Sequence, residues 1–401
     1  MRWSDNIQNL GCQVVYYPGY FSLPTLADFS EPLDTQLLGP DMQKVMELAG
    51  RTCYESVGFG RSTTQYFKHI VEVGHLSVGE HGAITVRCEI PHSVYIFIPW
   101  LLMNRPGLWV RLDTSSIDGP EIELTANLRT ILEWGKWFRS AASNKESTRY
   151  RLDKHLDSIL YRGLSWAMRS HVPALEGYMD EILCANYSKQ LAEETLDTSV
   201  MRLGMADFDF REVTPETDEQ IWISLFLQGS RGFSHEMVRH GDFTAISQRS
   251  TRFVDETDSP WIEHPLLHEY LSDPNNQISM QGDLSDCQED CQNVYQGIVD
   301  TLSAWLPRKY PNLNKTTARK QARGAARGYL GNALATNMVF SASVAEWREI
   351  LKQRGNPAAD WEMRELTCCV FQELLTTPYA ERFSDFHLVP EENGMGMCVT
   401  S

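Results

Sequence analysis

The sequence lacks a long apolar run, which excludes an ordinary membrane-spanning helix. Its longest apolar run covers residues 94–103, contains Pro99 and is shorter than the roughly 20 residues that a helix needs to cross a bilayer. Residues 1–6 do not have the basic and then apolar layout of a secretory signal peptide. We therefore expect a cytoplasmic protein without a membrane partner.

The sequence also has too little positive charge for a general nucleic-acid-binding surface. Its 36 Lys and Arg residues stand against 53 Asp and Glu residues, which gives a formal net charge of −17. Because polymeric nucleic acid is bound largely through its phosphates, we expect no such partner. Local basic clusters in so acidic a chain instead predict a specific small anionic ligand.

Paired cysteines and recognisable metal motifs are lacking as well. The nine cysteines are odd in number and scattered, which favours free thiols in a reducing compartment. Cys287 and Cys291 have no second pair to complete a zinc site. The spacing of His75, Glu80 and His81 matches no zinc motif, so we expect no metal site. A metal hydrolase built on these three residues is the remotest alternative.

Residues 235–254 are the most informative stretch that is present. We expect a helical turn in which Phe233, Met237 and Val238 face a core, because they recur at helical spacing. His235 and Arg239 share another face of this turn. Gly241 is expected to end it, since glycine readily adopts the left-handed conformation found at helix ends.

A polar loop is expected next, at residues 247–252. Together with Arg239, its arginines and hydroxyls suit an anion and a planar polar ring. The alternative is a solvated basic loop.

A second basic element is expected on a helix over residues 315–330. Arg319, Arg323 and Arg327 lie four residues apart and therefore share one face. Like charges in such a row repel each other, so something should compensate them. Either a bound phosphate or acidic side chains of a packed neighbour could compensate the charge of these arginines.

The remaining periodic segments predict a mixture of helices and strands. Residues 1–39 have no strong period and are expected to be irregular. Residues 256–285 are turn-rich. Strands are expected at 84–88 and 221–227, and helices at 41–53, 62–74, 122–138, 150–203, 288–305, 343–354 and from 359 onward.

The middle of the chain leaves two alternatives open. Residues 84–93 have a pattern like that of residues 223–230, and residues 127–134 have a pattern like that of residues 344–350. The middle segment is therefore either a plain insertion or a decayed tandem copy.

Several blocks, in the correct order, resemble the flavin-dependent thymidylate synthases, the ThyX family. The signature of that family is matched by Arg239-His240-Gly241, then Ser250, then Arg252-Phe253, with Gly241 in place of a second Arg. Weaker blocks are residues 49–54, 74–81, 326–330 and the helix that ends at Arg354. This chain is identified as a divergent member with a long middle insertion or decayed repeat.

The resemblance implies an α+β fold, with a core of a small antiparallel sheet and helices and a mainly helical insertion. The division it implies is an N-terminal extension at 1–39, a catalytic core at 40–90 and 220–385, an insertion or degenerate repeat at 91–219, and a C-terminal tail at 386–401. The absence of a Gly-x-Gly-x-x-Gly or Walker loop means that a flavin is held outside a Rossmann frame.

The resemblance also implies a reaction, namely the C5 methylation of dUMP to dTMP. Methylenetetrahydrofolate would supply the carbon, and reduced FAD, charged by NADPH, the hydride. The signature has no cysteine, so attack by a thiolate on the pyrimidine is not supported. Arg354 is the expected catalytic residue, because it would stabilise negative charge as C5 becomes nucleophilic.

The implied binding residues follow position by position. The expected substrate contacts are Glu236, Arg239, Gln248, Arg249, Ser250, Thr251, Arg252, Arg327 and Arg354. The expected cofactor contacts are His75, Ser77, Arg239, His240 and Gln248.

The resemblance further implies a homo-oligomer, a dimer or tetramer, with shared active sites. Two other functions remain open. One is methyl or hydroxymethyl transfer to another pyrimidine nucleotide, and the other is a non-catalytic nucleotide-binding homologue.

Overall fold

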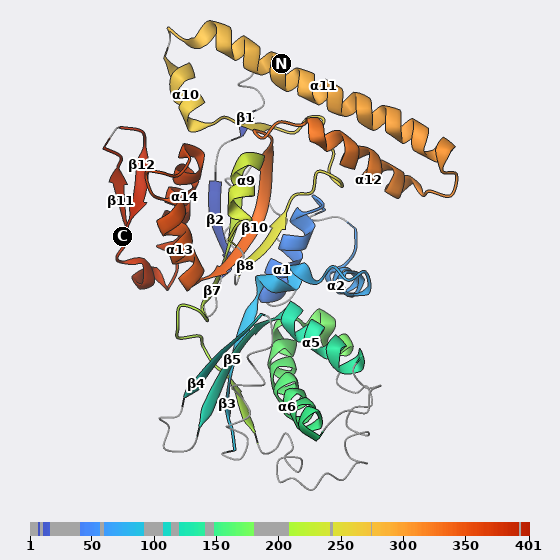
Figure 1. The fold of residues 1–401 in the computed structure, drawn as a ribbon, viewed down its shortest axis with the longest axis vertical. Helices are drawn as coiled ribbons and strands as arrows, with labels where there is room; N and C mark the ends of the chain where they lie inside the picture. The colour runs from blue at the N-terminus through green and yellow to red at the C-terminus, as the bar shows by residue number, and fades with distance from the viewer. Residues whose placement is uncertain are drawn as a thin grey trace.

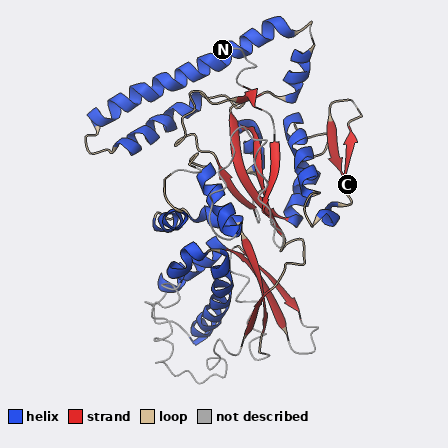
Figure 2. Ribbon diagram, turned by 180° about the vertical axis from the view of Figure 1, so that it is seen from behind, coloured by secondary structure: helices blue, strands red, loops and turns tan. Residues whose placement is uncertain are grey.

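The computed structural model of the chain contains helices packed around two four-stranded antiparallel sheets (Figures 1 and 2). The α+β prediction is therefore confirmed. No helix in the described part of the chain is both long and apolar enough to cross a membrane. The structure describes residues 7–8, 11–16, 41–56, 60–91, 107–113, 120–140, 148–179, 208–240, 244–273, 275–392 and 394–401.

The first sheet has the strand order β2-β7-β10-β8. β7 (Trp222–Ser230) and β10 (Ala335–Ser343) form its centre and pair along their whole lengths. Every residue of β7 is buried, which explains the continuous apolar run that predicted a strand here. β8 (Thr244–Gln248) is the edge strand on the β10 side.

The other edge of this sheet comes from the N-terminal segment. β2 (Gly11–Tyr16) pairs with β7, so the expectation of an irregular backbone over residues 1–39 is wrong at this point. A short edge strand is held by backbone hydrogen bonds to its neighbour and leaves little pattern in the sequence. β1 (Ile7–Gln8) pairs with β9 (Trp261–Ile262).

The second sheet has the order β4-β5-β3-β6. β3 (Ala83–Glu89) is the strand expected at 84–88. β4 (Leu108–Asp113), β5 (Glu121–Asn127) and β6 (Asp209–Glu212) all come from the middle segment. The described residues of the middle segment thus supply three of the four strands here, although more of them are helical, over Leu128–Ser140 and Thr148–His171.

The predicted helix over residues 122–138 divides into a strand and a helix. β5 covers its first part, and only Leu128–Ser140 is helical, as α5. Ile122, Leu124 and Ala126 alternate along β5 and are almost completely buried. Pairing with β3 and β4 on both sides stabilises the extended form of this segment.

Helices cover the second sheet and fill the space between the sheets. α1 (Asp41–Thr52) and α2 (Thr63–Glu72) lie as expected, and Ser62 caps α2 with a capping box. α6 (Thr148–His171) packs against β3 and α5, and is followed by the short 3-10 helix η4 (Pro173–Leu175). The core around them also contains Phe226 and Val339 of the first sheet, so both sheets share one core.

The C-terminal half supplies the helices on the first sheet. α9 (Arg231–Met237) follows β7 directly, and α13 (Val344–Arg354) follows β10 directly. The core stripe of α13 is formed by four buried residues, Val344, Trp347, Ile350 and Leu351. α14 (Trp361–Leu374) packs against α13, and the hairpin of β11 (His387–Pro390) and β12 (Met397–Thr400) packs against α14, after the turn η8 (Ala380–Phe383).

A helical arm extends from one end of the first sheet (Figure 1). It consists of α11 (Gln277–Lys309) and α12 (Lys315–Ala326), which lie side by side, with α10 (Pro265–Ser272) before them. α10 and the early start of α11 occupy part of residues 256–285, which were expected to be turn-rich. η7 (Arg327–Tyr329) connects the arm to the segment that leads into β10.

The two sheets share a local order of elements. The central strand β5 runs straight into α5, as β10 runs straight into α13. Each sheet also takes an edge strand from the other half of the chain, because β2 pairs with β7 while β6, just before β7, pairs with β3. A tandem copy would have this order, and the choice between insertion and repeat stays a prediction.

Candidate functional site

The signature stretch begins at the end of β7, where Ser230 caps α9. The Ser230 hydroxyl accepts a hydrogen bond from the Phe233 amide at 3.0 Å and donates to the buried carboxylate of Glu362 at 2.7 Å. Phe233 and Met237 face the core as expected. Val238 does not, since α9 ends at Met237 and Val238 is 48% exposed. The helix thus ends before Gly241, which lies outside the described residues.

Near the end of α9, four charged side chains are linked to His240, either directly or through one another. Arg354 Nη1 donates to Glu236 Oε2 at 2.8 Å, and Arg239 Nη1 donates to the same oxygen at 3.0 Å. Arg354 Nε donates to His240 Nε2 at 3.1 Å. We call these residues, with Glu346, the Arg354 cluster.

The hydrogen bonds of His240 fix its protonation state. Arg354 can only donate, so Nε2 of His240 must be the acceptor and Nδ1 must carry the proton. Nδ1 accordingly faces Glu346 Oε1 at 3.3 Å. Burial, and then the charge of Arg354, lower the pKa of His240 below its ordinary value, while Glu236 opposes this shift. The imidazole is therefore neutral at neutral pH.

A second basic group lies at the opposite end of α9. Arg231 and Arg327 line a cavity of about 310 Å³ together with His235 and Thr251. Among the described residues, no Asp or Glu lines this cavity, which we call the α9 pocket. Burial lowers the pKa of Arg231, Glu256 raises it, and the like charges of Arg327 and Arg249 lower it further. The pocket thus holds two mutually repelling guanidinium groups.

Residues 247–252 do not form the single polar loop that was expected. Ser247 and Gln248 belong to β8, and Gln248 Nε2 donates to Thr336 Oγ1 at 3.2 Å. The irregular part begins after them, with the Ser250 amide donating to the Cys53 carbonyl at 3.0 Å. This bond joins the signature to the segment after α1.

The arginines of this stretch have different surroundings. Arg249 is 9% exposed and forms ion pairs with Glu55 and with the fully buried Glu256, the latter at 3.1 Å. It also donates to Ser259 Oγ at 2.8 Å. Its charge is therefore already compensated inside the protein. Arg252 lies instead against the backbone of Gly324 in α12.

The arginine row of the arm is compensated in one place by an acidic neighbour. Arg323 Nη2 donates to Asp255 Oδ2 at 2.5 Å, which agrees with the second of the two expected compensations. Arg327, one turn further, instead faces the α9 pocket.

His75 lies just before the 3-10 helix η2 (Leu76–His81), and Ser77 lies on it. Both residues are exposed. His75 Nδ1 is 3.3 Å from Tyr54 Oη, and the Tyr54 ring packs edge-on against Phe253 at 4.7 Å between centroids. The expected cofactor residue His75 is thus connected to the end of the signature through Tyr54.

His81 has a structural position rather than a metal-binding one. It is completely buried, and its two ring nitrogens lie 2.8 Å from the hydroxyls of Ser341 and Ser247. Burial lowers its pKa to about 3. In the described part of the chain, no group of three or more His, Cys, Asp or Glu side chains could hold a metal ion.

Sequence reasoning brought some site residues together correctly and missed others. Glu236, Arg239, His240 and Arg354 do converge, whereas Arg327 lies at the other end of α9. Arg231 and His235 line the α9 pocket but were not among the expected contacts. A signal for Arg231 was present, because an arginine directly after a buried strand and an N-cap serine stands at a helix N-terminus.

Comparisons with known proteins match the part of the chain that carries these residues. A family model described as thymidylate synthase complementing protein matches residues 212–377, which include α9, β8, Arg327 and Arg354. The flavin-dependent thymidylate synthase of Mycobacterium sp. (strain KMS) is 30% identical over 184 residues, or 45% of this chain and 69% of the relative. That of Corynebacterium aurimucosum is 30% identical over 182 residues, or 45% and 68%. The chain therefore belongs to the flavin-dependent thymidylate synthase family.

Proposed function

We propose that this protein methylates C5 of dUMP to form dTMP, with methylenetetrahydrofolate as carbon donor and reduced FAD, charged by NADPH, as hydride donor. The observation that carries this proposal is the pairing of an anion pocket and an arginine cluster at the two ends of α9. α9 extends over seven residues, so about 9 Å of helix separates its ends at 1.5 Å per residue.

The α9 pocket is the proposed site of the nucleotide phosphate. Arg231, which is partly buried, and Arg327, which is exposed, carry like charges that repel each other. A phosphate dianion would relieve this repulsion and accept charge-assisted hydrogen bonds from both groups. The Thr251 hydroxyl lines the same pocket and can donate a further bond.

Arg354 is the proposed partner of the uracil ring. Three of its five N–H donors are used by His240 and Glu236, which leaves two for a substrate. Because Glu236 and His240 hold the guanidinium in place, no reorganisation is needed as negative charge develops on the ring. Loss of one such donor typically raises a barrier by about 3 kcal/mol.

A bound flavin would supply the hydride and accept electrons from NADPH. The chain offers exposed groups that fit such a ring, namely His75 and Ser77 beside Tyr54 and Phe253. Neutral His240 would orient Arg354, and Gln248 would keep an edge of β8 polar near the ring. We further propose a homo-oligomer, a dimer or tetramer, with shared active sites.

The experiment is an absorbance spectrum of the purified protein with added FAD, followed by turnover with dUMP, methylenetetrahydrofolate and NADPH. We expect a bound-flavin spectrum and dTMP as product. Parallel reactions with UMP and dCMP test the other pyrimidine nucleotides, and turnover of these alone would reject thymidylate synthesis. A protein that takes up no FAD but still binds dUMP would be a non-catalytic homologue.

A further inference from the structure

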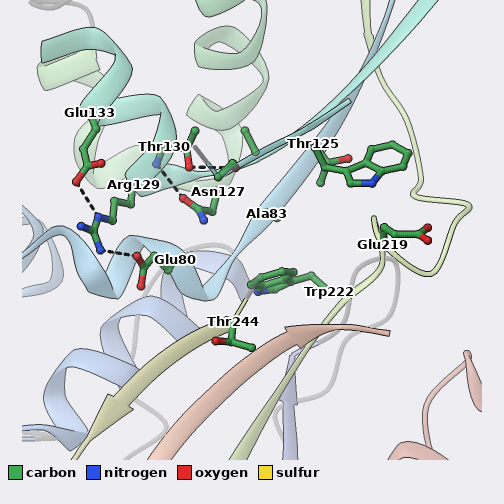
Figure 3. Close-up of a pocket in the computed structure, with 13 residues that line it drawn as sticks. Glu80, Ala83, Thr125, Asn127, Arg129, Thr130, Glu133, Glu219, Trp222 and Thr244 are labelled. Atoms are coloured by element: carbon green, nitrogen blue, oxygen red, sulfur yellow. Dashed lines mark hydrogen bonds and ion pairs between the residues drawn. The ribbon is translucent and has the colours of Figure 1, made fainter. Parts of the chain in front are cut away.

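Two cavities of the described chain differ in whether their cations are available to an anion. The larger one, of about 480 Å³, is lined by β4, β5 and α5 and by the starts of β7 and β8 (Figure 3). Its cation Arg129 is already bonded to Glu80 at 2.5 Å and to Glu133 at 2.7 Å (Figure 3). The lining of the α9 pocket, as far as the structure describes it, contains no carboxylate. An anion therefore suits the α9 pocket better.

The backbone donors at the start of α9 are not available to such an anion. The amides of Arg231 and Gly232 donate to carbonyls of the segment after η7 at 2.9 and 3.0 Å. The amide of Phe233 donates to the Ser230 hydroxyl at 3.0 Å. Because these amides are already bonded, side chains have to hold an anion in the α9 pocket.

His235 is a side chain of this pocket that can gain a charge. It follows Arg231 by four residues, so the two side chains share a face of α9, and both line the pocket. His235 is exposed, and its imidazole makes no hydrogen bond or ion pair with another described residue. Its ring nitrogens are thus available to a ligand.

The groups that line the pocket with His235 are basic or uncharged. Arg231 comes from α9 itself, and Arg327 comes from η7. Thr251, from the turn after β8, is uncharged. Residues 328–334 contain no acidic or basic side chain.

The carboxylates nearest to this end of the signature are bound elsewhere. Glu236 accepts hydrogen bonds from Arg354 and Arg239. Glu256 forms an ion pair with Arg249 at 3.1 Å. Neither carboxylate lines the α9 pocket, so neither holds a proton on an imidazole there.

These surroundings couple the charge of the imidazole to the occupancy of the pocket. Two guanidinium groups disfavour a third positive charge, whereas a dianion within about 4–6 Å favours one. Arginine stays charged at neutral pH, while histidine is the side chain that gains or loses a proton near it. A dianion in the α9 pocket therefore brings a proton with it, and a monoanion does so less.

We propose that His235 is a third cationic contact for phosphate in the α9 pocket and takes up a proton when a phosphate monoester dianion binds. The substrate class is then a free mononucleotide with a terminal phosphate. A nucleotide inside a polymer is disfavoured, because its phosphodiester carries only one charge. This inference rests on the proposed function, which places the nucleotide phosphate in this pocket.

The test uses inorganic sulfate, which remains a dianion over the whole pH range of interest and carries no base. Calorimetric titration of the full chain in two buffers with different heats of ionisation gives the number of protons taken up per sulfate. His235→Gln keeps a polar side chain that cannot be protonated. His387→Gln is the matched control, because His387 is an exposed histidine of β11 that does not line the pocket.

We expect the wild type and His387→Gln to take up a fraction of a proton per sulfate at neutral pH. Both should bind sulfate about threefold or more tightly at pH 6 than at pH 8. His235→Gln should take up no proton and lose this dependence on pH. The proposal is overturned if the wild type binds no sulfate, or if His235→Gln takes up as many protons as the control.

A second titration tests the substrate class. At about pH 7.5 the phosphate of dUMP is a dianion, whereas its methyl ester is a monoanion. We expect the wild type to bind dUMP about tenfold or more tightly than the ester, and His235→Gln to show a smaller preference. An equal preference in both proteins would reject the role of His235 in this choice.

These outcomes are separable from those of the proposed function. Proton uptake with sulfate that depends on His235, in a protein that forms no dTMP, would leave the inference standing and reject thymidylate synthesis. Formation of dTMP together with equal proton uptake in the wild type and His235→Gln would have the reverse meaning.

Discussion

Arg354 Nε donates a hydrogen bond to His240 Nε2 at 3.1 Å, so the last residue of α13 fixes the tautomer of a signature histidine. The same guanidinium binds Glu236, which also holds Arg239. The orientation of three signature residues therefore depends on a residue far along the chain.

Replacing Arg354 should affect turnover more than substrate affinity. We expect Arg354→Ala to lower kcat for dTMP formation by about a hundredfold or more, since a preorganised donor to the developing charge is lost. Arg354→Lys should restore little, because an ammonium group cannot bind Glu236 and His240 with the same planar set of donors. Steady-state kinetics separates kcat from KM. An unchanged kcat in Arg354→Ala would contradict the proposed catalytic role.

The pKa of His240 should report the loss of Arg354 independently of activity. Arg354 is one of the causes that lower this pKa, the largest being burial. We expect Arg354→Gln to raise the pKa of His240 toward its ordinary value while leaving it below that value. Titration of the imidazole by NMR measures the change. A lower pKa of His240 in the variant would contradict the hydrogen bond from Arg354 Nε to His240 Nε2.

The α9 pocket should discriminate a nucleotide from its nucleoside. We expect Arg327→Gln to weaken dUMP binding by about tenfold or more, because a charge-assisted bond to phosphate is lost. Deoxyuridine binding should hardly change. Arg319→Gln on the same helix face is the control, as Arg319 is exposed and does not line the pocket. Calorimetric titration of the three proteins with both ligands gives the comparison.

The same Arg327→Gln variant should not lose thermal stability. Arg327 acts on Arg231 as a like charge in the ligand-free protein, so its removal relieves repulsion. A lower Tm in this variant without nucleotide would argue that Arg327 has a structural partner.

Arg249 should stabilise the fold rather than bind the substrate. We expect Arg249→Met to destabilise the fold by about 3–5 kcal/mol, because it leaves the carboxylate of the fully buried Glu256 without its cation. Arg239→Met, whose side chain is 66% exposed, should change stability little. Denaturant unfolding of both variants tests this. A stable Arg249→Met variant with a raised KM for dUMP would favour a substrate-binding role instead.

His81 should make the fold sensitive to acid. Its pKa is lowered to about 3 in the folded chain, whereas an unfolded histidine takes up a proton near pH 6.5. Unfolding therefore takes up a proton between these values, and stability falls as the pH drops from about 6.5 toward 3. We expect a shallower fall of Tm with acidification in His81→Asn than in the wild type. His387→Asn, at an exposed histidine of β11, is the control and should keep the wild-type slope.

Periodicity predicted the elements whose faces are set by local pattern. Val344, Trp347 and Ile350 recur at helical spacing, and all three are buried on α13. The boundary between β5 and α5 was missed because buried apolar residues recur from Ile122 to Leu132, first at strand spacing and then at helical spacing. The predictions were therefore accurate where one period was maintained and inaccurate where the period changed.

The site was predictable only as far as the signature extends. Arg239, His240 and Arg354 lie in recognisable blocks, and the structure brings them together. The role of Arg231 depends on the approach of Arg327 from the arm, which is a tertiary contact without a local pattern. The ion pairs of Arg249 with Glu55 and Glu256 are tertiary contacts of the same kind.

The exchange of edge strands makes the two halves of this chain inseparable. A fragment cut just before β6 would retain β3 without one neighbour, and the remaining piece would retain β7 without β2. β7 is buried along its whole length, so the second piece would expose an apolar strand with unpaired backbone donors and acceptors, which favours aggregation. If the gene were split at this point, the two fragments would therefore have to be produced together in order to fold.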